Sequence, residues 1–198
     1  MLSVMHDRRS EERLVEIVRS SALLMRALRA ARTVGPPDWL VGAGAVRDLV
    51  WDRLHGVRGK MQPKDVDLVF FDPTSLDGER ERIVLGALEE LAPDIVWDVQ
   101  NQASVHTWYP RVFGVEVEPL LGSADGVATW PETASAVAVR LLADDSIEVV
   151  APCGLEDLFG LVWRRNPRRV TVDEYRRRIE RKQVARRWPR VQVIAEQG

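Results

Sequence analysis

Apolar residues recur every three or four positions between about Ser10 and Ala31, with charged residues between them. This spacing predicts an amphipathic helix with Ser10 as its N-cap and Gly35-Pro36-Pro37 as its stop. Trp39-Leu40-Val41 is then a short buried strand that leads into Gly42-Ala43-Gly44 and a second helical pattern. The chain therefore opens with a helix, a strand, a glycine turn and a helix.

Two later segments have the composition of buried strands. Asp65–Asp72 and Asp94–Asn101 are rich in β-branched and aromatic residues, and a helical pattern over Asp77–Leu91 separates them. The alternation of helices and strands predicts a layered α+β (α/β) domain, in which helices pack against a mixed sheet.

Beyond Gln102 the pattern is less regular, and each element is predicted from local signals. Those signals favour an edge strand around Val115 and Val117, helices over Pro131–Leu142, Leu155–Arg164 and Thr171–Arg187, and a strand over Ser146–Ala151. We expect residues 1–36 to pack as an N-terminal helix on a core at residues 37–152. Residues 153–198 would form a basic helical segment of the same domain.

Composition supports a single globular domain. The chain has 198 residues, of which 45% are hydrophobic and 29% charged, which excludes a disordered or collagen-like protein. Its one cysteine, Cys153, allows no intrachain disulfide and no cysteine metal cluster. The absence of a signal peptide or transmembrane stretch from the sequence leads us to expect a soluble, cytoplasmic protein that does not bind membranes.

The net charge of −2 hides an asymmetry along the chain. The segment from Arg164 to Arg190 holds 12 of the 28 Lys and Arg residues but only three acidic residues. An acidic body and a basic segment are therefore separate electrostatic regions. The basic segment can bind a polyanion such as RNA, or its arginines can pair with the acidic body.

Asp65 and Asp67 lie two residues apart in a predicted strand, so their side chains leave the same face. Two neighbouring carboxylates repel, and a shared divalent cation such as Mg²⁺ removes that repulsion. In the alternative interpretation, one aspartate caps the start of the strand and the other is solvated.

The glycine turn favours the interpretation that Asp65 and Asp67 bind a metal ion. Gly42 and Gly44 join a strand to a helix, where backbone N–H groups and the helix dipole favour an anion such as phosphate. Glycines in such a turn can also serve close packing alone. A phosphate cradle followed by paired carboxylates is the combination that phosphoryl transfer needs.

These residues carry a family resemblance. The run from Leu40 to Asp48, followed by Asp65-Val66-Asp67, resembles the signature of the DNA polymerase β-like nucleotidyltransferase superfamily. Further blocks resemble an uncharacterised bacterial family of small nucleotidyltransferase proteins: Ala43–Trp51, Trp97–Ala103, Trp130–Ala134 and Ala151–Phe159.

The resemblance implies a mixed sheet and three carboxylates that hold two Mg²⁺ ions, which Mn²⁺ can replace. Asp65 and Asp67 match the first two carboxylates, and Gly42, Ala43 and Gly44 match the phosphate-holding turn. Many superfamily members have a serine in this turn where the present chain has alanine. Backbone amides, Arg47 or Lys64 would then hold the phosphates.

For the third carboxylate we choose Asp98. Strand alternation sends its apolar neighbours to one face and Asp98 to the other, which suits a metal ligand or a catalytic base. Glu116 and Glu118 alternate in a similar way but are more simply solvated edge residues.

Other candidates carry less weight. Arg47 can hold a phosphate, or it can pair with Asp48 or Asp52 on its own helix. Polar residues after the third strand, including Asn101 and His106, can contact a base or ribose, or satisfy a loop backbone. Arg164 can likewise contact the triphosphate. Trp108 and Tyr109 can form a surface on which a base stacks.

The sequence therefore predicts a Mg²⁺-dependent nucleotidyltransferase. It would move a nucleoside monophosphate from an NTP to an unidentified acceptor hydroxyl and release pyrophosphate. Asp65, Asp67 and Asp98 would be its catalytic residues and metal ligands. The alternative is a non-catalytic nucleotide- or RNA-binding module with the same fold. An antibiotic-modifying enzyme would share the chemistry and differ in its acceptor.

Overall fold

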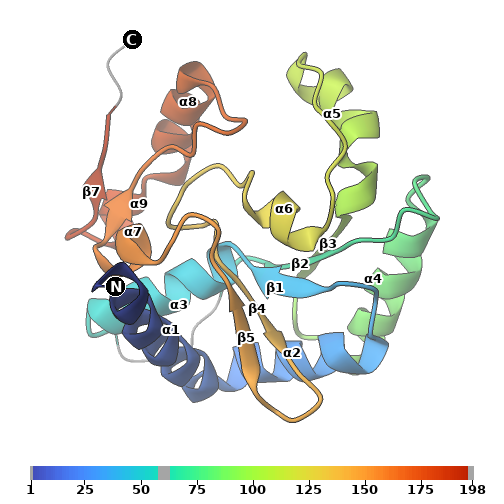
Figure 1. Ribbon diagram of the computed structural model, residues 1–198, viewed down its shortest axis with the longest axis horizontal. Helices are drawn as coiled ribbons and strands as arrows, with labels where there is room; N and C mark the ends of the chain where they lie inside the picture. The colour runs from blue at the N-terminus through green and yellow to red at the C-terminus, as the bar shows by residue number, and fades with distance from the viewer. Residues whose placement is uncertain (1, 58–62, 196–198) are drawn as a thin grey trace.

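The computed structural model describes residues 2–57 and 63–195, with side chains described from residue 8. Its centre is a five-stranded sheet in the order β3-β2-β1-β4-β5 (Figure 1). β2 and β3 are parallel, and the other neighbouring pairs are antiparallel. The strands are β1 (Leu40–Gly42), β2 (Val66–Phe70), β3 (Trp97–Asn101), β4 (Ala138–Leu141) and β5 (Ile147–Val150). The predicted mixed sheet is thus confirmed.

Helices cover both faces of this sheet (Figure 1). One face carries α1 (Leu2–Ser20), α2 (Ala22–Val34), α3 (Gly44–Leu54) and α4 (Glu79–Leu91). The other face carries α5 (Val105–Phe113), α6 (Ser123–Val127) and α8 (Val172–Lys182). Among the helices of the described part of the chain, none is long and apolar enough to cross a bilayer.

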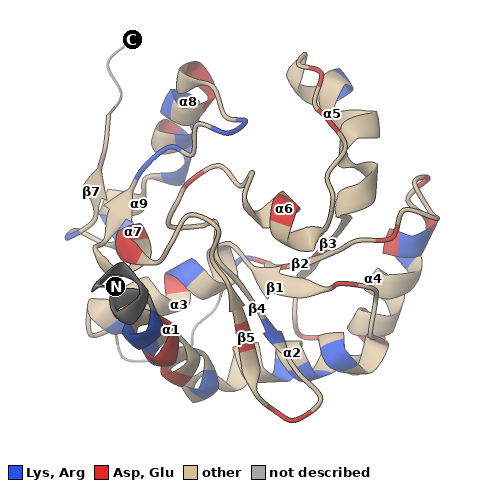
Figure 2. Ribbon diagram, viewed as in Figure 1, with Lys and Arg blue, Asp and Glu red and all other residues tan. Residues whose placement is uncertain are grey.

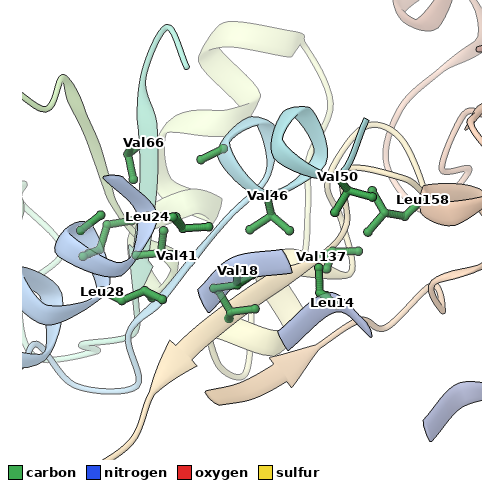
Figure 3. Packing of buried hydrophobic residues seen from close by; sticks show 14 of the residues in the cluster. Leu14, Val18, Leu24, Leu28, Val41, Val46, Val50, Val66, Val137 and Leu158 are labelled. Atoms are coloured by element: carbon green, nitrogen blue, oxygen red, sulfur yellow. The ribbon is translucent and has the colours of Figure 1, made fainter. Parts of the chain in front are cut away.

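Strand alternation divides the buried residues between the two faces. Val66, Leu68 and Phe70 of β2 join the main core with α1 to α4, part of which Figure 3 shows. Val69 points to the other side, into a smaller cluster with Val127 of α6. The odd-numbered positions of β2 therefore face the side of the sheet that carries α5, α6 and α8.

The predicted helix over Ser10–Ala31 is two helices. α1 ends at Ser20, and Ser21 caps α2 by accepting a 3.2 Å hydrogen bond from the backbone N–H of Leu24. Ser10 lies inside α1 and is not an N-cap. The predicted stop is confirmed, because Gly35 takes a left-handed conformation with φ 61° at the end of α2.

The region from residue 102 to 142 differs most from the prediction. Residues 115–117 form no strand, and α5 and α6 were not predicted. The segment expected as a helix over Pro131–Leu142 contains β4 (Ala138–Leu141), and the pairing of β4 with β1 overrides the helix preference of the alanines at Ala134, Ala136 and Ala138. Gly42 permits this pairing, since a Cβ there would lie 2.5 Å from the carbonyl oxygen of Val137.

The C-terminal helices are shorter than predicted. The expected helix over Leu155–Arg164 is the single turn α7 (Glu156–Phe159) followed by β6 (Val162–Trp163), which pairs with β7 (Gln192–Val193). The basic helix divides at Gln183, whose φ is 45°, into α8 and α9 (Val184–Arg187). The strand predicted over Ser146–Ala151 is confirmed as β5.

The end of the basic segment packs on α3. Arg187 forms ion pairs with Asp48 and Asp52 at 3.1 and 3.0 Å, and the indole N–H of Trp188 donates to Asp52 at 2.8 Å. Trp188 also packs edge-on against Trp51, with ring centroids 5.2 Å apart. These contacts tie residues near the C-terminus to the helix that follows the glycine turn.

Candidate active site

Three strands bring the predicted site residues into one row. In the sheet register, Gly42 of β1 lies opposite Asp67 of β2, and Asp67 lies opposite Asp98 of β3. Neighbouring strands are about 4.8 Å apart, so the end of the glycine turn and two carboxylates lie side by side. Asp65, two residues before Asp67, precedes the first residue of β2.

The three aspartates influence one another electrostatically. Burial raises the pKa of Asp67 to about 7, with further increases from the charges of Asp65 and Asp98. Burial, followed by the charge of Asp65, also raises the pKa of Asp98. The positive charges of Arg47 and Lys182 act in the opposite direction on the pKa of Asp67. Removing solvent from mutually repelling carboxylates stabilises their protonated forms.

These carboxylates lack counter-ions of their own. Within residues 2–57 and 63–195, Asp65, Asp67 and Asp98 form no hydrogen bond or ion pair through their carboxylates. An all-oxygen donor set of this kind suits a hard divalent cation such as Mg²⁺ or Mn²⁺. In the same part of the chain, no three His, Cys, Asp or Glu side chains are already gathered closely enough to hold an ion. The oxygen donors of the three aspartates are therefore the feature that fits such a cation.

A cavity of about 410 Å³ opens beside Asp67 and Asp98, between α5 and α8. Figure 1 shows these two helices rising from the same side of the sheet, and Figure 2 shows the Lys and Arg residues along α8. One wall of the cavity is aromatic and the other is cationic. The aromatic wall consists of Trp108, Tyr109 and Phe113, and the cationic wall includes Arg169, Arg177, Arg178 and Arg181.

The floor of the cavity follows the two-residue period of β3. Asp98, Gln100 and Gln102 line it, whereas Trp97 and Asn101 are buried. The Asn101 side chain donates to the carbonyl oxygens of Asp72 and Ser75 and accepts from the N–H groups of Asp72 and Ala103. Asn101, expected as a base or acceptor contact, is instead the residue that satisfies this loop backbone.

The glycine turn combines close packing with an open helix N-terminus. Gly42 is needed for the approach of β4, and Ala43 has a φ of 53°. The N-terminus of α3 has no side-chain cap and no acidic residue in its first turn. A Cβ at Gly44 would lie 3.7 Å from a guanidinium nitrogen of Arg47, an ordinary van der Waals distance, so this guanidinium borders the turn. Free N–H groups at such a terminus favour an anion.

Arg47 is committed to the protein interior. It is 7% exposed, and its guanidinium donates to Asp48 and, at 2.7 Å, to the hydroxyl of Ser135. It also stacks between Trp51 and Trp163, at 5.5 and 5.0 Å from the ring centroids. The ion pair with Asp48, which the sequence left as the alternative, is therefore present, and a contact between Arg47 and phosphate stays a prediction.

The remaining expected contacts lie apart from the cavity. Arg164 pairs with Asp157 at 2.9 Å and does not line the cavity. His106 does not line it either, and its Nδ1 is buried without a hydrogen-bond partner in the described structure. Lys64 is exposed just before β2.

Sequence reasoning missed two residues that border the site. Glu132 is fully buried and accepts two hydrogen bonds from Arg178, which holds this arginine in the cavity wall. The pKa of Lys182 lies below its usual value, because of burial and of the positive charges of Arg178 and Arg47. The negative charges of Asp65 and Glu132 act on this pKa in the opposite direction. Lys182 therefore lies within electrostatic reach of the aspartates. The sequence offered one signal for Lys182: lysine is rare in this chain, which has 25 arginines and three lysines.

Comparisons with known proteins agree with the fold. A family model described as nucleotidyltransferase matches residues 29–193. A solved NMR structure, described as revealing a CCA-adding enzyme head domain, is similar with a TM-score of 0.77 and 26% sequence identity. The alignment covers 93% of this chain and 96% of that one. No curated protein matches the chain.

Proposed function

The chain belongs to this nucleotidyltransferase family, and from that premise we propose that it transfers a nucleoside monophosphate from an NTP to an acceptor hydroxyl. Pyrophosphate would be the second product. The observation that carries the proposal is the row formed by Gly42, Asp67 and Asp98 on three adjacent strands, with Asp65 beside it. This row places the uncapped N-terminus of α3, which can attract an anion, beside carboxylates that have no partner in the described structure. Phosphoryl transfer requires both features.

Asp65, Asp67 and Asp98 would hold two Mg²⁺ ions, or Mn²⁺ in their place. When bound, these ions would neutralise charge on the triphosphate and lower the pKa of the attacking hydroxyl. Asp98, at the edge of the cavity, would also accept the proton of that hydroxyl.

The backbone N–H groups of Gly42, Ala43 and Gly44 and of the first turn of α3 would hold the phosphates. The turn has no serine to add a hydroxyl contact. Lys182 and Lys64 are the cations we assign to assist it, since Arg47 is occupied by Asp48 and Ser135. In this scheme Arg47 acts on the site through its charge rather than by contact.

The test is an assay of pyrophosphate release with each NTP, Mg²⁺ and pools of candidate acceptors such as RNA, proteins and aminoglycosides. Asp67→Asn and Asp98→Asn should each reduce the rate by about 100-fold or more, because the reacting phosphoryl group loses its electrostatic support. Glu116→Gln is the matched control, since Glu116 is exposed and does not line the cavity. Full activity in both aspartate variants would overturn the proposal.

A second candidate is a nucleotide- or RNA-binding module without turnover. The turn without serine favours it, whereas the presence of Asp65, Asp67 and Asp98 together disfavours it. Calorimetry separates the two functions. Binding of an NTP that requires Mg²⁺ supports the enzyme, whereas binding of RNA without nucleotide, weakened by salt, supports the module.

The Arg164–Arg190 segment gives limited support to RNA as the acceptor. Many of its arginines pair with acidic side chains: Arg164 with Asp157, Arg168 with Asp125, Arg178 with Glu132, and Arg187 with Asp48 and Asp52. Their charge is therefore largely neutralised within the protein. We leave the acceptor open between RNA and other hydroxyl compounds.

A further inference from the structure

We propose that the cavity between α5 and α8 is the nucleobase site for the NTP, and that Gln100 favours a base with an amino group in the position of adenine N6 or cytosine N4 over one with an oxo group there. This inference rests on the proposed nucleotidyl transfer and names the substrate features that the same site would recognise. Three observations support it: the direction of the strands, the aromatic wall of the cavity, and the hydrogen bonds of Gln100 and Gln102.

The direction of the strands sets the two ends of the site. β1 runs antiparallel to β2 and leaves the sheet at Gly42, opposite Asp67. The glycine turn and the N-terminus of α3 therefore continue past Asp67 toward its Asp65 side. The cavity lies on the other side of Asp67, where Val69 and Gln100 line it. Phosphates on the turn and an α-phosphate at the carboxylates would direct the nucleoside into the cavity.

The aromatic wall offers a stacking surface. Trp108 and Tyr109 lie on one turn of α5 with ring centroids 5.9 Å apart, and Tyr109 and Phe113 are 4.4 Å apart. The guanidinium of Arg169 lies 5.4 Å from the centroid of Tyr109, which links the cationic wall to the aromatic one. Every base has a π face that can stack on aromatic side chains, and the phosphates need no such surface.

Gln100 lines the cavity and has a side-chain oxygen that is not engaged within the described structure. Its amide nitrogen donates to the carboxylate of Glu81 at 2.8 Å and, more weakly, to the carbonyl oxygen of Asn101 at 3.4 Å. Both partners are acceptors, which fixes the orientation of the amide. The side-chain oxygen has no partner among the described residues. An acceptor at this position favours the amino groups of adenine and cytosine over the oxo groups of hypoxanthine and uracil.

Gln102 is held in place by α6. The residue is 4% exposed, and a Cβ on Gly126 would lie 2.1 Å from its side-chain oxygen, so the two segments pack as closely as a glycine allows. Its side-chain nitrogen has a single long contact within the described structure, at 3.5 Å to the carbonyl oxygen of Gln100. A buried amide with unused hydrogen-bonding capacity in a cavity wall is suited to a polar ligand.

The first experiment separates the base from the phosphates. Calorimetry would compare a non-hydrolysable ATP analogue with inorganic tripolyphosphate, both with Mg²⁺. Trp108→Ala should weaken binding of the ATP analogue by about 5- to 100-fold and leave tripolyphosphate unchanged. Trp108→Phe should retain most of the affinity, and the control Val112→Ala should retain all of it, because Val112 is 64% exposed and outside the cavity lining. Equal losses for both ligands, or none, would overturn the proposal.

The second experiment tests selection of the amino group. The wild type should bind the ATP analogue more tightly than its ITP counterpart, and the CTP analogue more tightly than that of UTP, by about two- to tenfold. Gln100→Leu should abolish this preference, and the exposed control Gln192→Leu should preserve it. Equal binding of each pair by the wild type would refute the role of Gln100.

Failure of the base site and failure of the proposed function give different results. If the transfer proposal is wrong, tripolyphosphate will not bind in a Mg²⁺-dependent manner, or Asp65→Asn/Asp67→Asn will not change its binding. If the base site alone is wrong, tripolyphosphate will bind as expected while Trp108→Ala has no effect on the ATP analogue.

Discussion

Two charged regions of this molecule contrast in how their charges are satisfied. The aspartates on β2 and β3 lie in the sheet without hydrogen-bond or ion-pair partners in the described part of the chain, whereas many arginines of residues 164–190 are paired. A pair such as Glu132 with Arg178 satisfies its own charges, whereas neighbouring carboxylates without a partner repel one another. The contrast separates charges that hold the fold together from charges that a ligand can use.

The largest expected effect on stability comes from breaking the buried pair between Glu132 and Arg178. Glu132→Ala should lower the free energy of unfolding by about 3–5 kcal/mol, because it leaves Arg178 partly buried without its carboxylate. Asp94→Ala removes an exposed pair with Arg26 and should cost about 1 kcal/mol or less. Urea unfolding followed by circular dichroism measures both values. Similar losses in the two variants would mean that burial of the pair has no special importance.

A smaller effect on stability is expected from the unpaired carboxylate of Asp67. The pKa of Asp67 is raised from 3.8 in the unfolded chain to about 7 in the fold, so the folded state holds this proton more tightly. Its contribution to stability is complete below pH about 4 and is lost as the pH rises through about 7. Without divalent cations, the free energy of unfolding should therefore fall by a few kcal/mol over this range. Asp67→Asn should flatten the decline in urea titrations, and an equally steep decline in that variant would assign it to other groups.

The smallest effect compares a paired arginine with an unpaired one. Arg187→Gln should reduce stability by about 1 kcal/mol, because Asp48 and Asp52 lose a shared partner, and should leave tripolyphosphate binding intact. Arg181 lines the cavity and forms no hydrogen bond or ion pair with another described residue. Arg181→Gln should therefore leave the melting temperature unchanged and weaken binding of the ATP analogue a few-fold. The reverse pattern would contradict the division into structural and ligand-binding charges.

The parts of this site that depend on local pattern could be predicted from the sequence. The apolar runs of β2 and β3 fixed their strand character, and alternation identified Asp98 as a polar residue on the face opposite the core. The same alternation assigns Asn101 to the face opposite Asp98. Of the two interpretations that the sequence leaves open for Asn101, the structure shows the contact with the loop backbone.

Other parts depend on tertiary contacts that no local pattern records. β4 begins at Ala138, and its pairing is possible because Gly42 lets it approach β1. The electrostatic influence of Asp65 on Lys182 depends on where α8 lies in the fold, since the two residues are far apart in the chain. The orientation of Arg47 likewise depends on Ser135 and Trp163, which belong to distant segments.

The central claim is that Asp65, Asp67 and Asp98 form a divalent metal site. Its most direct test is binding of Mn²⁺, measured by electron paramagnetic resonance at pH 8, to the wild type, to Asp65→Asn/Asp67→Asn and to the control Glu116→Gln. The account predicts saturable Mn²⁺ binding to the wild type and the control that Mg²⁺ displaces, and none at this site in the double variant. Equal Mn²⁺ binding by all three proteins, or none by the wild type, would contradict it.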